Sequence, residues 1–184
     1  MDESPLILTL RFDDKSFAIF DTARRKHFPP ERNVIPAHLT LFHHLPGGEH
    51  AEIADAVEAA AAARAPFPLK ITGMRFLGQG TAYIIESPQL LAIRGDLARK
   101  WGSKLTPQDA QGFRPHVTIQ NKTPAPAAKA LFDELSASFE PFEVTATGFL
   151  LWHYRGGPWQ AAGEFGFREG SGRAASNNQE GSNV

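Results

Sequence analysis

Short stretches of alternating hydrophobic and polar residues recur along this 184-residue chain, and stretches with helical spacing of apolar residues separate them. Alternation is typical of a strand with one buried face, whereas apolar residues three and four apart are typical of an amphipathic helix. Prolines and glycines, such as Pro29, Pro46 and Gly78, mark the breaks. Strands are predicted over residues 6–12, 37–41, 69–77, 81–86, 115–121, 142–154 and 159–168, and helices over residues 14–28, 49–63, 88–101 and 125–138.

The order of these elements repeats within the chain. The segments that begin at Pro66 and Pro141 both read Pro-Phe-x-aliphatic-x-x-Thr-Gly-apolar. Pro66 follows His38 by 28 residues and Pro141 follows His116 by 25, with an alanine-rich helical stretch between them in each half. A repeat with the same order and similar spacing indicates an internal duplication.

The duplication predicts an α+β fold that is bilobal, with two pseudo-symmetric antiparallel sheets and flanking helices around a central cleft. We expect a single domain over residues 1–168, with lobes at approximately 1–80 and 81–168 of the sequence. Residues 169–184 are rich in glycine, serine and asparagine, and we expect a disordered tail there.

One short motif occurs in both halves, in the segments Ala37-His38-Leu39-Thr40-Leu41 and Pro115-His116-Val117-Thr118-Ile119. In a strand, residues two apart lie on one face, so each histidine would lie ~7 Å from its threonine. The aliphatic neighbours would face the core. Two such strands indicate a site with two histidines; the alternative is that both are half-buried strands whose histidines form local hydrogen bonds.

Two histidines on opposite sides of a cleft suit displacement at phosphorus. Histidine titrates near neutral pH, so one imidazole can take a proton from the attacking oxygen while the other gives one to the leaving oxygen. The threonine hydroxyls can donate to nonbridging phosphate oxygens, where negative charge builds up. No carboxylate cluster accompanies the motifs, so this chemistry calls for no metal and no cofactor.

Net charge, cysteine content and the first residues limit the possible binding partners and the cellular location of the protein. The formal net charge is −1, so the chain has no overall positive field for holding long nucleic acid nonspecifically. The absence of cysteine excludes disulfides, thiolate metal sites and cysteine nucleophiles. The first residues resemble neither a signal peptide nor a membrane span. We therefore expect a cytoplasmic, monomeric protein that does not contact membranes.

The paired motifs resemble those of the two-histidine phosphoesterase superfamily, which includes 2′-5′ RNA ligase-like proteins and RNA 2′,3′-cyclic phosphodiesterases. The resemblance extends over roughly residues 5–168. It implies a bilobal α+β fold and metal-independent cleavage of a cyclic phosphodiester or a 2′-5′ linkage. It also implies catalytic roles for His38, Thr40, His116 and Thr118.

Four other residues are candidates for substrate binding. Arg114 and Lys122 flank the second motif and could hold phosphate, although solvated strand ends are the alternative. Phe42, on the His38 face by strict alternation, and Tyr83 could stack on a base, with core packing as the alternative.

Other polar residues near the motifs and on the helices have simpler explanations. His44 shares the face of His38 by alternation, and a metal site is conceivable, but strand-end polar residues are the simpler interpretation. The basic residues Arg94, Arg99 and Lys100 on the helix at 88–101 are expected on a solvated face.

The leading hypothesis is an enzyme that opens a 2′,3′-cyclic phosphate on an RNA end or a nucleotide. Alternatives are cleavage of a 2′-5′ oligonucleotide and of a small nucleotide such as an ADP-ribose cyclic phosphate. Two further alternatives are a noncatalytic module that binds RNA ends and a metal-binding protein built on His38, His43 and His44.

Overall fold

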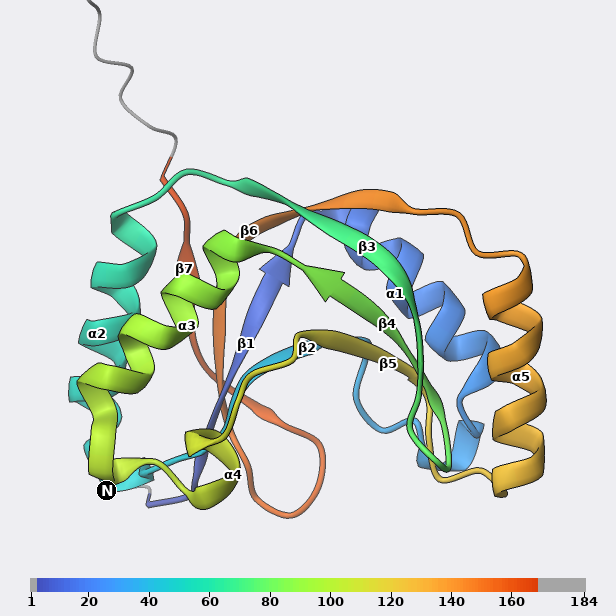
Figure 1. Cartoon of the computed structure of the whole chain (residues 1–184). Coiled ribbons are helices and arrows are strands. Elements are labelled where there is room, and N and C mark those ends of the chain that lie inside the picture. The colour runs from blue at the N-terminus through green and yellow to red at the C-terminus, as the bar shows by residue number, and fades with distance from the viewer. Residues whose placement is uncertain (1–2, 169–184) are drawn as a thin grey trace, which may run out of the picture.

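The computed structural model describes residues 3–168 and arranges them as one curved sheet flanked by helices (Figure 1). The strands are β1 (Leu6–Phe12), β2 (Leu39–Leu45), β3 (Phe67–Phe76), β4 (Thr81–Glu86), β5 (His116–Gln120), β6 (Phe142–His153) and β7 (Gln160–Gly166). The helices are α1 (Asp14–His27), α2 (His50–Ala62), α3 (Pro88–Trp101), α4 (Pro107–Ala110) and α5 (Ala125–Ala137).

The sheet is antiparallel, and its strand order is β2-β1-β6-β3-β4-β5, with β7 paired to β6. Although β2 and β5 stand at opposite ends of this order, they contact each other. The sheet therefore curls until its two edges meet, and Figure 1 shows β2 and β5 side by side in the middle of the molecule. The predicted α+β class is confirmed. The strands expected in two sheets form one, because β3 pairs with β6.

The pairing of β3 with β6 relates the two halves of the chain. Leu69 lies opposite Val144, and these residues hold the same position in the two Pro-Phe repeats. The register continues symmetrically on both sides, with Phe67 opposite Ala146 and Ile71 opposite Phe142. A pseudo-twofold axis thus passes through the Leu69–Val144 pair.

The two halves interlock. The first-half strand β3 pairs with the second-half strand β4, and the second-half strand β6 pairs with the first-half strand β1. The first-half helix α1 packs against the second-half strand β5. The two halves of the sequence therefore contribute strands to one sheet and do not form separate sheets.

The helices begin where the sequence supplies caps. Asp13 caps α1 by accepting a hydrogen bond from the Ser16 amide at 2.7 Å, and Ser87 caps α3 in the same way through the Leu90 amide at 3.1 Å. In the described region α2 packs against β6 and β7, and α5 packs against β3 and β4. The largest fully buried side chains include Phe20, Phe42, Phe149, Leu6, Leu8 and Leu39.

Among residues 3–168, no helix is long and apolar enough to cross a membrane. The tail expected at residues 169–184 lies outside the described residues.

Candidate functional site

Both histidine motifs lie where the edges of the curled sheet meet. His38 directly precedes β2, and His116 is the first residue of β5. Thr40, on β2, and His116 line the same polar cavity of about 450 Å³. His38 lines a neighbouring apolar groove of about 340 Å³ together with Val34 and Trp159. The structure thus brings Thr40 and His116, which are 76 positions apart in the sequence, to one cavity.

The two imidazoles are held in matching ways. Nδ1 of His38 lies 2.8 Å from the Pro36 carbonyl oxygen, and Nδ1 of His116 lies 2.9 Å from the Arg114 carbonyl oxygen. A carbonyl oxygen can only accept, so each neutral ring carries its proton on Nδ1. Nε2 of both rings is then left as an unprotonated nitrogen that can accept a proton from a ligand.

Both histidines favour the neutral form. Burial, the largest cause, and the positive charge of Arg24 together lower the pKa of His38 to about 4, although the hydrogen bond to Pro36 opposes the shift. Burial also lowers the pKa of His116, and nearby Arg75 adds to this effect. Burial is the largest cause for both residues, because it removes the water that solvates an imidazolium and so destabilises the charged form.

A bulge in β2 determines which side chains accompany His38. Thr40 lies opposite Thr9 and Phe42 lies opposite Leu8, so Leu41 is an extra residue in β2. A bulge of this kind reverses the faces of the residues that follow it. In consequence His43, and not Phe42, lines the polar cavity beside Thr40.

The second motif carries a bulge at the matching position. Thr118 lies opposite Ala82 and Gln120 lies opposite Thr81, so Ile119 is an extra residue in β5. In both motifs the extra residue directly follows the threonine. The duplication therefore extends to the irregularities of the two edge strands.

Phe42 and Tyr83 occupy the interior. Phe42 is 0% exposed and its ring packs edge-on against Trp101 at 4.8 Å, so it is not available to stack on a base. Tyr83 is half-buried between Phe20 and Phe142, and burial raises the pKa of its phenol. The alternation that predicts Phe42 on the His38 face fails because of the bulge at Leu41.

The two basic candidates differ in position. Arg114 is exposed and lines the polar cavity. Lys122 is exposed beyond the end of β5 with a φ of 58°, and it lies outside both the polar cavity and the apolar groove.

Several polar residues at the site are missing from the sequence-based set. Arg75 of β3 lines the polar cavity and forms no ion pair with any residue of the described region. Arg94 is 7% exposed, which corrects the expectation of a solvated face. Its position four residues after Leu90 and three before Leu97 is the signal for burial, because residues at this spacing share one helix face.

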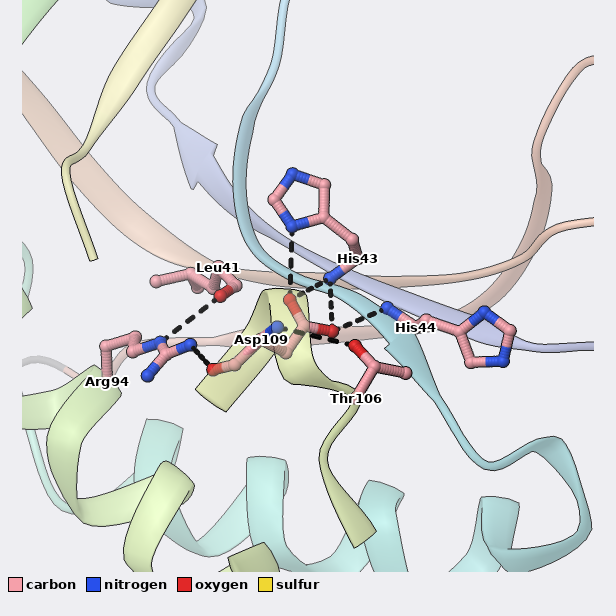
Figure 2. A network of polar contacts seen from close by, with 6 residues as sticks. All are labelled: Leu41, His43, His44, Arg94, Thr106 and Asp109. Carbon is pink, nitrogen blue, oxygen red and sulfur yellow. Dashed lines mark hydrogen bonds and ion pairs between the residues drawn. The ribbon is translucent and has the colours of Figure 1, made fainter. Parts of the chain in front are cut away.

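Asp109, from α4, organises the edge of β2 (Figure 2). Its carboxylate accepts hydrogen bonds from the main-chain amides of His43 and His44, and Nδ1 of His43 lies 3.1 Å from Oδ1. Burial favours the neutral acid, but these contacts hold the pKa of Asp109 below its usual range. No cluster of three or more potential metal ligands occurs among residues 3–168, so His38, His43 and His44 do not converge on one point.

Comparison with solved structures shows the same fold in other proteins. TT0787 of Thermus thermophilus is 21% identical, with a TM-score of 0.64 over 89% of this chain and 98% of TT0787. E. coli LigT complexed with 3′-AMP is 16% identical, with a TM-score of 0.59 over 91% of this chain and 100% of LigT. At these identities the likeness shows the fold alone.

Sequence comparison supplies the family. A search of the curated proteins finds no match to the chain. The model of the 2′-5′ RNA ligase superfamily matches residues 12–158, which include both histidine motifs and most of both halves. The chain therefore belongs to the 2′-5′ RNA ligase superfamily.

Proposed function

We propose that this protein is a metal-independent phosphoesterase that opens a 2′,3′-cyclic phosphate on an RNA end or a nucleotide. The observation that carries this proposal is the matched state of His38 and His116. Each donates Nδ1–H to a carbonyl two residues earlier and keeps Nε2 free. Paired groups of this kind can act as the base and the acid of one displacement.

In the proposed reaction, Nε2 of one neutral histidine takes a proton from water as the water oxygen attacks phosphorus. The other histidine, protonated, gives its proton to the ribose oxygen whose bond to phosphorus breaks. The product is a nucleoside monophosphate, and a proton exchange with solvent restores the pair. Thr40 and Thr118 donate their hydroxyls to the nonbridging oxygens, where charge develops in the transition state.

The surroundings of the histidines support a substrate of nucleotide size. The polar cavity of about 450 Å³ falls within the range of small-ligand sites, and Arg75 and Arg114 supply positive charge there. The apolar groove beside His38 offers Trp159, whose ring lies 4.7 Å from the His38 ring, for contact with a base. LigT has structures with 3′-AMP and with NADP+, and the proposal extends nucleotide binding to this chain.

The test is turnover of 2′,3′-cyclic AMP by the wild type and by His38→Ala, His116→Ala and the double variant. Each single substitution should lower kcat by about 10²- to 10⁴-fold, the usual contribution of a positioned acid or base. The double variant should lose little more, because the two groups serve one step. His27→Ala, at the end of α1, is the matched control and should retain activity.

Two further measurements define the reaction. Activity should persist in a chelator, and kcat/KM should follow a bell-shaped pH profile with its maximum below the ordinary histidine pKa, because burial lowers the pKa of both histidines. A folded single-histidine variant with wild-type turnover would contradict the paired mechanism. Comparison of 2′,3′-cyclic AMP with an ADP-ribose cyclic phosphate, a 2′-5′ dinucleotide and an RNA ending in a cyclic phosphate separates the alternative substrates.

A further inference from the structure

Two buried arginines lie on the corresponding helices of the two halves, α1 and α3. Arg24, on α1, is 4% exposed, and Arg94, on α3, is 7% exposed. Each helix lies between the first and second strands of its own half, and each guanidinium reaches the motif strand of the other half. We propose that Arg24 and Arg94 are reciprocal positioning residues that fix the two histidine motifs relative to each other.

Arg24 connects the second motif to the segment that precedes the first motif. Its Nη1 donates to the carbonyl of Thr118 at 2.8 Å, beside the bulge of β5. Its Nε donates to the carbonyl of Ile35 at 3.2 Å and to Oδ1 of Asn33 at 2.8 Å, in the segment that leads to His38. One side chain thus ties the approach to the first histidine to the threonine of the second motif.

Arg94 makes the corresponding connection from the other side (Figure 2). Its Nε donates to the carbonyl of Leu41, the extra residue of the β2 bulge, at 3.4 Å. Its Nη2 donates to the main-chain carbonyl of Asp109, whose carboxylate binds the amides of His43 and His44. Arg94 therefore joins β2 to the segment that continues into His116.

Stability alone does not explain these two arginines. Burial of a guanidinium is costly, and an apolar side chain of similar volume often stabilises a core as well or better. Both charges are covered by aromatic rings, Arg24 by Phe28 at 4.0 Å and Arg94 by Phe42 at 4.4 Å. What the guanidinium adds is a rigid set of donors that can satisfy several carbonyls at once.

The position of these carbonyls explains the need for such donors. β2 and β5 are the edge strands of the sheet, and the bulges interrupt the regular ladder beside the catalytic threonines. A donor from the opposite half fixes the strand edge and the separation of the motifs together. Arg24 has a second effect: its positive charge favours neutral His38.

The inference rests on the proposed function and is tested with Arg24→Lys, Arg24→Met, Arg94→Lys and Arg94→Met. Misplacement of a reacting group by about 1 Å can cost ~10²-fold in rate, so we expect kcat for 2′,3′-cyclic AMP to fall 10- to 100-fold, with KM changed less than about threefold. The lysine variants keep the positive charge but lose the planar set of guanidinium donors, so they should not restore kcat. Lys26→Met and Arg99→Met, on exposed faces of the same helices, are the matched controls.

Loss of stability must be separated from loss of position. Val57→Ala removes packing from a fully buried site on α2 and serves as a destabilised reference. When Val57→Ala and an arginine variant have lost the same amount of Tm, Val57→Ala should keep the wild-type kcat, whereas the arginine variant should not. Arginine variants that match the reference in kcat would overturn the proposal.

A second readout does not depend on turnover. NMR titration of the His38 ring, assigned by comparison with His38→Ala, should give a higher pKa in Arg24→Met than in the wild type, and a near wild-type pKa in Arg24→Lys and Arg94→Met. An unchanged pKa in folded Arg24→Met would overturn the link between Arg24 and His38. A wild type that titrates as expected but turns over no cyclic nucleotide would instead contradict the proposed function.

Discussion

His38 is neutral in the folded protein at pH values where a free imidazole is partly charged. Burial lowers its pKa to about 4, whereas an unperturbed histidine titrates near ~6.5. Between these values the unfolded chain binds more protons than the folded chain, so stability falls as the pH drops through this window. Above it, both states are neutral and the contribution of His38 is constant.

His38→Asn removes this titration while keeping an amide donor for the Pro36 carbonyl. Between pH 7 and pH 5 we expect the wild type to lose ~1–2 kcal/mol more stability than the variant, allowing for solvent screening. Thermal unfolding followed by circular dichroism at successive pH values measures the difference. His44→Asn, at an exposed imidazole, should keep the wild-type slope. Equal slopes for wild type and His38→Asn would show that folding leaves the His38 pKa unshifted.

At the level of elements, both Pro-Phe repeats contain a bulge at the threonine of their Thr-Gly pair. Ile71 pairs with Ile85 and Gly73 with Ile84, so Thr72 is an extra residue in β3. Thr147 is likewise extra in β6, because its neighbours Ala146 and Gly148 pair with Phe12 and Arg11. The glycines that follow, Gly73 and Gly148, differ in their surroundings. At Gly148, strand β6 also pairs with β7, where Gly148 lies opposite Gly166.

This difference predicts that the same substitution destabilises the protein at Gly148 and has little effect at Gly73. A Cβ at Gly148 would lie 2.4 Å from the Phe165 carbonyl oxygen, whereas a Cβ at Gly73 would meet its nearest neighbour, Ile84 Cδ1, at 3.8 Å. We expect Gly148→Ala to cost ~1–3 kcal/mol of unfolding free energy, as overpacking does. Gly73→Ala should change it by less than ~0.5 kcal/mol. Urea unfolding measures both, and equal midpoints would contradict the close packing of β7 against β6.

The sequence predicts the elements better than their irregularities. Apolar periodicity places the strands and helices, and the repeated His-x-Thr and Pro-Phe segments reveal the duplication. Strict alternation cannot reveal the bulge at Leu41. It therefore assigns the residues after Thr40 to the wrong faces and predicts Phe42 at the site. Arg24 and Arg94 follow a spacing that indicates burial, but their partners lie in the other half, and no local pattern identifies such contacts.

At the scale of the whole molecule, the two halves of the sequence interlock, and both contribute residues to the site. β3 leaves its own half to pair with β4 and β6, while α1 packs against β5. A chain cut in the turn between β3 and β4 would leave unpaired strand edges and exposed apolar faces in both fragments. Such edges and faces are unfavourable in water.

We therefore expect fragments 1–78 and 79–184 to fold only together. Gly78, with a φ of 84°, lies in the β3–β4 turn, so the cut removes no regular element. Each fragment alone should show no cooperative unfolding transition by circular dichroism, and an equimolar mixture should regain one. Mixing wild-type 79–184 with a 1–78 fragment that carries His38→Ala should restore the fold, with turnover of 2′,3′-cyclic AMP about 10²- to 10⁴-fold below that of the wild-type mixture. A cooperative transition in either isolated fragment would show that a half is an independent folding unit, and the pairing of β3 with β6 would then be a docking contact between two domains.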